Sequence, residues 1–192
     1  LAQAENLEDK NNSKNSLPLA IWVQPTLVPE THPLSGVNGV NNAILVEGEP
    51  IGEVMFYGPG AGAGPTASAV VADILNITGV SQLNQPSNKE LDSLLAAVSW
   101  RDCHIVDTSK IIQKFYLRLN TIETPGVIGR IGTIFGNHGV SIQSIVQFDA
   151  SNEGAEIVVI TNAVPQGQMN KSLNEIKSLS EIKGIAALMG CL

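Results

Sequence analysis

One stretch of the sequence decides the fold, namely Glu123-Thr-Pro-Gly-Val-Ile-Gly-Arg-Ile-Gly-Thr-Ile-Phe-Gly-Asn-His-Gly-Val-Ser-Ile-Gln-Ser-Ile-Val146. Pro125 and Gly126 interrupt the preceding segment and open a helix, because a proline in the first helical turn sacrifices no hydrogen bond. The helix then carries apolar residues at helical spacing, which predicts one buried stripe. These residues are Val127, Ile128, Ile131, Ile134 and Phe135.

Two predicted strands flank this helix. Gly139 suits the left-handed residue that follows a helix, and the β-branched segment Val140 to Val146 comes next. On the other side, Phe115 to Asn120 alternates apolar and polar residues, as a half-buried strand does. The unit therefore reads strand, glycine turn, helix, strand.

The same order recurs downstream. Ala155 to Thr161 predicts a strand, Pro165 opens a second helix, and Ile182 to Met189 predicts a last strand. The second helix places Met169, Leu173, Ile176 and Leu179 on one face. Two such halves make a ferredoxin-like βαββαβ fold of the α+β class, in which two helices cover one face of a four-stranded antiparallel sheet.

The composition narrows the classes of function. Of the 192 residues, 43% are hydrophobic, which is enough to form a core, and 15% are charged. The net charge of −7 argues against nucleic acid as a partner, because phosphate backbones bind clustered Lys and Arg. We expect no membrane span, no disulfide scaffold and no metal site, since there are only two cysteines, and we expect a cytoplasmic protein. Because the chain starts at Leu1 without a methionine, we expect a fragment of a longer protein.

The N-terminal third has a different pattern. Leu1 to Ser16 is polar and predicts a frayed helix end followed by a solvated loop. Leu17 to Leu27 predicts a strand, and residues 42–57 predict a hairpin with a Gly-Glu-Pro turn. We therefore expect the last strands and a helix of an α/β region before the ferredoxin-like domain.

A run of alternating glycines follows this hairpin and precedes a helix that opens at Pro65. The run includes Gly60, Ala61 and Gly62. Glycines before a helix N-terminus can bring backbone N–H groups up to an anion, but the spacing is not the Gly-x-Gly-x-x-Gly of a dinucleotide fold. A tight structural turn and a cofactor-facing loop both remain open interpretations.

Residues 79–109 predict a linker. It contains a short amphipathic helix over Lys89 to Val98 and a strand or spacer over Trp100 to Asp107. Cys103 and His104 are adjacent, so on a strand they point to opposite faces and cannot share a metal ion.

The C-terminal pattern resembles an ACT domain, the amino-acid-sensing module of metabolic enzymes, over residues 110–192. The resemblance rests on Glu-Thr-Pro-Gly-Val-Ile in the first turn and on His-Gly-Val-Ser-Ile at the second strand. It implies an effector site between two copies, where the Gly126 and Val127 N–H groups hold a carboxylate and Glu123 accepts from an ammonium. Ser141 and Gln147 would reach the ligand or the partner chain. A capping role for Glu123, a solvent-facing Ser141 and an exposed His138 at the helix end are the alternatives.

From Leu17 onward, the N-terminal part resembles the end of the catalytic region of bacterial homoserine dehydrogenase, and we assign residues 1–78 to that region. The resemblance rests on five segments, Val23-Gln-Pro-Thr-Leu-Val-Pro29, His32-Pro-Leu34, Val40 to Gly48, Gly52 to Gly62 and Pro65 to Asp73. It implies NAD(P)H-dependent interconversion of aspartate semialdehyde and homoserine, with Gly62, beside Gly60 and Ala61, facing NADP or NAD in the full-length enzyme. The Rossmann domain and catalytic lysines would precede Leu1, so we expect no bound cofactor and no dehydrogenase activity in this chain alone.

The two resemblances together imply feedback regulation by an amino acid, threonine. They also imply a homodimer joined through the edges of the ACT sheets, with Ala155–Thr161 and the last strand supplying the shared face. A free-standing amino-acid sensor and a ligand-free dimerisation module are the alternatives.

Overall fold

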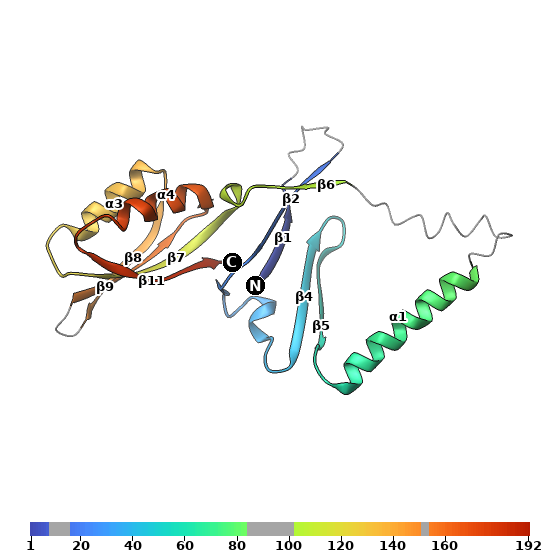
Figure 1. The fold of residues 1–192 in the computed structure, drawn as a ribbon. Coiled ribbons are helices and arrows are strands. Elements are labelled where there is room, and N and C mark those ends of the chain that lie inside the picture. Colours follow the sequence, from blue (N-terminus) through green and yellow to red (C-terminus); the bar gives the residue numbers. More distant parts are fainter. Residues whose placement is uncertain (8–15, 84–101, 151–153) are drawn as a thin grey trace. The chain divides into compact units, whose positions relative to one another are not determined.

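The computed structural model describes residues 1–7, 16–83, 102–150 and 154–192 (Figure 1). The chain divides into two compact units. The first combines Leu1–Val28 with Arg101–Leu192, and the second is Pro29–Trp100. The predicted helix over Lys89 to Val98 lies outside the described residues.

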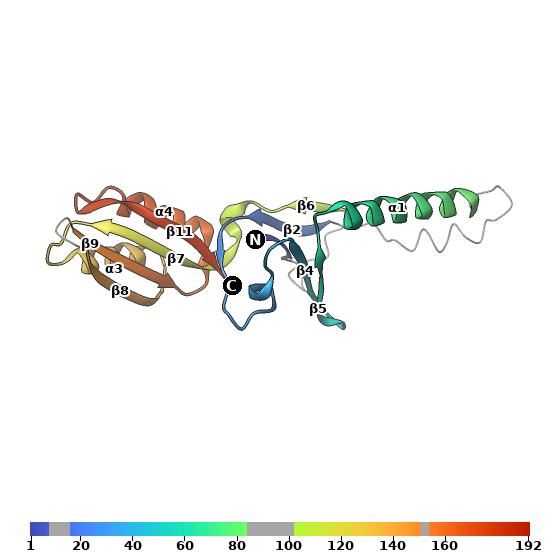
Figure 2. The same cartoon turned by 90° about the horizontal axis from the view of Figure 1, so that it is seen from below.

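The C-terminal part of the first unit is a helix-and-sheet sandwich. Its four main strands follow the order β11-β7-β9-β8, and neighbouring strands in this order are antiparallel. Both helices cover the same face of the sheet (Figures 1 and 2). The elements are β7 (Ile112–Thr121), α3 (Val127–Asn137), β8 (Ile142–Ala150), β9 (Gly154–Thr161), α4 (Gln166–Ile176) and β11 (Ile182–Cys191). The predicted ferredoxin-like βαββαβ fold is confirmed.

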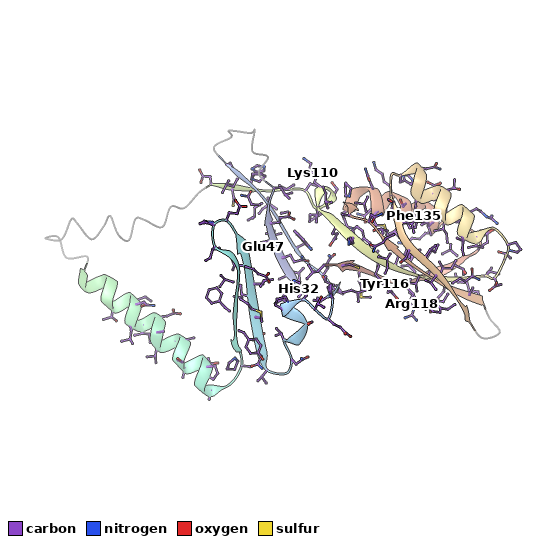
Figure 3. The ribbon with its side chains drawn as sticks, turned by 180° about the vertical axis from the view of Figure 1, so that it is seen from behind. His32, Glu47, Lys110, Tyr116, Arg118 and Phe135 are labelled. Atoms are coloured by element: carbon purple, nitrogen blue, oxygen red, sulfur yellow. The ribbon has the colours of Figure 1, made fainter. Side chains whose placement is uncertain are left out.

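The core lies between the helices and the sheet. Alternate residues of β7 point inward, and Phe115, Leu117 and Leu119 are at most 1% exposed. Phe135, labelled in Figure 3, and Ile131 fill the α3 side of this core. The predicted stripe on α3 is buried except for Ile128, which is 39% exposed. Leu179 lies beyond the end of α4 and packs against the core from the following turn.

The first unit also contains strands from the N-terminal segment. The strands β1 (Ala2–Asn6), β2 (Leu17–Val23) and β6 (Cys103–Ile105) form a separate sheet in the order β1-β2-β6. The prediction of a frayed helix end and loop was wrong for Ala2–Asn6, because β2 offers these residues an antiparallel partner. Two short pairings complete this unit: β3 (Thr26–Leu27) lies parallel to β11, and β10 (Val164–Pro165) pairs with β7. The 3-10 turn η2 (Thr108–Lys110) leads into β7.

The second unit is simpler. A 3-10 turn η1 (Pro33–Gly36) precedes the strands β4 (Asn41–Gly48) and β5 (Gly52–Pro59), which pair along their whole length. This confirms the predicted hairpin. Helix α1 (Ala63–Leu83) follows, and it begins two residues before Pro65. Among the described residues, no helix is long and apolar enough to cross a membrane.

Candidate functional site

The turn between β7 and α3 presents the N-terminus of a helix. Gly126 is the N-cap residue with φ 92° and ψ −5°, a left-handed conformation that glycine adopts without steric cost. The first helical hydrogen bond runs from the Arg130 N–H to the Gly126 carbonyl at 3.0 Å. The N–H groups before Arg130 therefore come ahead of the helical ladder, where the helix dipole favours an anion. Val127 anchors this turn, since its side chain is 5% exposed.

Two of the predicted effector residues meet at this turn. The Gln147 side-chain amide donates a hydrogen bond of 3.1 Å from Nε2 to Oε1 of Glu123, and both side chains are exposed. Glu123 follows the end of β7 and Gln147 lies on β8, so the fold joins residues 24 positions apart. The Glu123 carboxylate therefore contacts β8. The N-cap residue of α3 is Gly126, which has no side chain to cap the helix.

Ser141 lies elsewhere in the same chain. It immediately precedes β8, whose first residue Ile142 pairs with Thr161, whereas the other end of β8 pairs with Gly154. Ser141 and Gln147 are six positions apart, which corresponds to about 20 Å of extended strand. Ser141 is tied to Asn162 by two bonds, from Asn162 Nδ2 to its Oγ at 2.9 Å and from the Asn162 N–H to its carbonyl at 2.8 Å. One chain alone does not bring Ser141 to the Gly126 turn.

An ion pair beneath the turn was missed by the sequence reasoning. Arg130 Nη1 lies 2.6 Å from Oε1 of Glu181, whose side chain is only 14% exposed. The Glu181 carbonyl also accepts the Ile122 N–H at 2.8 Å. The other carboxylate oxygen, Oε2, is buried without a hydrogen-bond partner. Glu181 lies in the connection before β11, and no spacing in the sequence signals its position.

His138 differs from its expected environment. Its side chain is 26% exposed, and Nε2 lies 2.7 Å from Oε2 of Glu175 on α4. The residue therefore joins the two helices at this end of the sandwich.

The predicted cofactor loop is a tight turn between β5 and α1. A Cβ atom at Gly60 would overlap Asn42 Nδ2, and the Gly60 N–H donates to the Val40 carbonyl at 3.1 Å. Gly62 has φ 125°, and the Thr66 N–H donates to its carbonyl at 3.1 Å. A Cβ atom at Gly62 would meet only the Pro65 ring, at 3.5 Å, so the backbone there is otherwise open. Gly60 is thus held by its own hairpin, whereas the backbone at Gly62 is open apart from the Pro65 ring.

Two sequence profiles match the chain. The profile described as homoserine dehydrogenase matches residues 1–75, and the profile described as ACT domain matches residues 116–181. These ranges fall on the two parts of the chain that carry the Gly60–Gly62 loop and the Gly126 turn.

Individual relatives agree with the profiles. A homoserine dehydrogenase of Synechocystis sp. is 44% identical over 186 residues, covering 97% of this chain and 43% of the relative. The homoserine dehydrogenase of Bacillus subtilis is 33% identical and covers 90% of this chain and 40% of the relative. A crystal structure of a homoserine dehydrogenase from Thiobacillus denitrificans has a TM-score of 0.76 at 28% identity, covering 94% of this chain and 40% of that chain. The chain thus spans less than half the length of these relatives.

Proposed function

Since this chain joins a segment of the homoserine dehydrogenase family to an ACT domain, we propose that it is the C-terminal, regulatory part of a homoserine dehydrogenase. The full-length enzyme would interconvert aspartate semialdehyde and homoserine with NADP or NAD in the cytoplasm. The ACT domain would bind a free amino acid, threonine, and so regulate that activity. The observation that carries the proposal is that one chain matches the homoserine dehydrogenase profile over residues 1–75 and the ACT profile over residues 116–181.

The proposed site has complementary groups for the two ends of a free amino acid. The N–H groups at the start of α3, from Val127 onward, would hold the carboxylate with the help of the helix dipole. The Glu123 carboxylate would accept from the ammonium, and Gln147 orients that carboxylate from β8. A hydrogen bond to a charged group contributes about 1.5–3 kcal/mol, so Glu123 would account for a large share of the affinity.

The site would be completed by a second copy of the chain. In the sheet, β9 lies between β7 and β8, so the expectation that Ala155–Thr161 supplies the joining surface is wrong. The edge strand is β8, and exposed edges readily pair with another strand. Two β8 strands pairing antiparallel about a two-fold axis would place Ser141 of one copy beside the Gln147 end of the other.

The nicotinamide cofactor would lie against the other family segment in the full-length enzyme. Among the residues of this chain, Ala61 and Gly62 fit a flat ring, because the backbone is exposed there and Gly62 carries no side chain. When bound, the cofactor would supply the hydride for reduction of the aldehyde. The contribution of this loop would be to hold the ring, while Asn42 fixes the loop by packing against Gly60.

Titration of the 192-residue chain with threonine tests the proposal. We expect saturable binding by calorimetry, weakened roughly tenfold to a hundredfold in Glu123→Gln, which loses the charge but keeps a partner for Gln147. Glu53→Gln is the control, because Glu53 is an exposed acid on β5. Binding of another amino acid alone would favour a free-standing sensor.

A chain that binds none of the twenty amino acids would favour the ligand-free dimerisation module. The engagement of Glu123 by Gln147 within one chain is the observation that favours this second candidate.

A further inference from the structure

The N-terminal segment pairs with the edge of the ACT sheet through β3, and we call this β3–β11 pairing the seam. Strand β3 lies parallel to the end of β11, with Thr26 opposite Gly190 and Leu27 opposite Cys191. The Gly190 N–H donates to the Pro25 carbonyl at 3.3 Å, and the Leu192 N–H donates to the Leu27 carbonyl at 3.1 Å. Because residues 1–75 match homoserine dehydrogenase and residues 116–181 match the ACT domain, this seam connects the two family segments.

Three side-chain amides near this seam are hydrogen-bonded to one another. We call Gln24, Gln113 and Gln166 the glutamine cluster. Gln24 Nε2 donates to Gln113 Oε1, and Gln113 Nε2 donates to Gln166 Oε1 at 3.0 Å. Gln166 continues the chain of bonds, since its Nε2 donates to Asn170 Oδ1 on α4 at 2.9 Å. The cluster therefore links the β2–β3 connection, β7 and the first turn of α4.

The position of Gln113 explains why these amides bond to each other. Gln113 continues the inward-facing row of Phe115, Leu117 and Leu119 on β7, so a polar group stands at the end of an apolar row. A part-buried amide in such a place needs partners, because an unpaired one costs about 1–3 kcal/mol. Gly190 makes room for them, since a Cβ atom there would overlap Gln24 Nε2 and lie 2.7 Å from Gln113 Oε1.

The cluster is also connected to Ser141. The Asn162 backbone and side chain both bond to Ser141, and the chain from Asn162 runs through β10 into Gln166. Val164 of β10 pairs with Gln113, and the neighbouring Thr161 accepts the Phe115 N–H at 3.1 Å. Ser141 and Gln24 are thus joined by consecutive hydrogen bonds and one short segment of chain.

From these contacts we propose that the glutamine cluster couples the amino-acid site to the β2–β3 connection of the dehydrogenase segment. The inference rests on the proposed function, because Ser141 would contact the effector bound at the turn of the second copy. A ligand shifts a structure only by its differential affinity for two arrangements. Engaging Ser141 would favour one arrangement of Asn162 to Gln166, and the cluster would pass that preference to Gln24 and the β3–β11 seam.

Hydrogen exchange with Gly190→Ala tests this coupling. The three atoms nearest to the added methyl group belong to the distal ends of two flexible side chains, so we expect it to separate the amides while β11 keeps its backbone conformation. The matched control is Gly184→Ala on the same strand, where a Cβ atom meets nothing within 4 Å. Gln113→Leu is a second variant that removes the amide at nearly constant volume.

In the native chain and in Gly184→Ala, we expect saturating threonine to change exchange of the backbone N–H groups within residues 24–28, Pro25 excepted, by roughly fivefold or more. In Gly190→Ala and Gln113→Leu the change should vanish although threonine still binds, as calorimetry on the same samples reports. Threonine binding to the native chain without an exchange change at residues 24–28, or with one that survives both variants, would overturn the coupling alone. Absence of threonine binding would overturn the proposed function and the coupling with it.

Discussion

Gly126 and Gly62 occupy the same kind of position in two unrelated parts of the chain. Each precedes a helix with a positive φ, 92° at Gly126 and 125° at Gly62, so each lets the backbone enter a helix through a sharp corner. Near Gly126, the Glu123 carboxylate is hydrogen-bonded by the Gln147 amide. At Gly60, two residues before Gly62, the Asn42 amide packs directly against the backbone. The first arrangement leaves a carboxylate exposed beside a helix N-terminus, and the second leaves an uncharged amide against the backbone.

The two cysteines predict a difference in reactivity. Burial raises the pKa of the Cys191 thiol, and the nearby Lys114 opposes this rise only in part. At neutral pH a smaller fraction of Cys191 is therefore thiolate than for an unburied cysteine. Cys103 is exposed on β6. Because the thiolate is the nucleophile, we expect iodoacetamide at neutral pH to modify Cys103 several times faster, as peptide mass spectrometry would measure.

The same alkylation in denaturant is the control for this reactivity difference. The two thiols should then react at similar rates, because unfolding removes the burial of Cys191. Faster modification of Cys191 in the folded chain would contradict its placement beside β3.

Sequence reasoning found the residue types of the candidate site better than their partners. Glu123, Gly126 and Val127 lie within five consecutive residues, so a turn pattern identifies them together. The bond from Glu123 to Gln147 and the pair of Arg130 with Glu181 depend on strand order, which spacing along the chain does not encode. His138 was expected to be exposed, and its partner Glu175 comes from the packing of α3 against α4.

At the scale of elements, the stability of the ACT part depends on the inner face of α3. Ile131 is fully buried, whereas Ile128 on the same helix is 39% exposed. We expect Ile131→Ala to lower the free energy of unfolding by about 2–5 kcal/mol, because it leaves a cavity. Ile128→Ala should cost about 1 kcal/mol, as less apolar area is lost. Urea denaturation measures both, and equal losses would contradict the observed orientation of α3.

The element pattern was predictable wherever periodicity and a glycine or proline boundary agreed. This holds for all six elements of the βαββαβ fold and for the hairpin β4–β5. It fails for Ala2–Asn6, whose sequence is polar and whose strand exists because β2 lies beside it. It also fails for β3, because a two-residue strand is defined by its pairing with β11 and by no periodicity of its own.

At the scale of the whole molecule, the proposed dimer makes the origin of each site residue testable. If Glu123 and Ser141 of one site come from different copies, mixing Glu123→Gln chains with Ser141→Ala chains creates dimers with one intact site. Random mixing should restore high-affinity threonine binding to roughly a quarter of all sites, since half the dimers are mixed. Calorimetric stoichiometry measures this fraction.

The matched control for this mixing experiment is the double variant combined with the unchanged chain. In those mixed dimers every site carries one altered residue, so mixing should create no additional intact site. Failure of the two single variants to complement each other would mean that the site lies within one chain.

Helix α1 also raises a question that belongs to the whole molecule. Its apolar side chains Val70, Val71, Ile74, Leu75 and Ile77 are 52–67% exposed. These five side chains share one face of the helix, and an apolar face of this kind is normally packed against a folded core. This chain covers 43% of the Synechocystis relative, so a full-length enzyme would have ample polypeptide to enclose α1.

The pairing of β3 with β11 bears on how the proposed regulation by an amino acid would be removed by protein engineering. Deleting residues 110–192 would remove the β11 strand that pairs with Thr26 and Leu27, and would leave Gln24 without its partner Gln113. Such a deletion would destabilise the retained N-terminal segment as well as remove the proposed amino-acid site. A single replacement at the Gly126 turn would leave the β3–β11 pairing intact, and is therefore the less disruptive way to remove the proposed regulation.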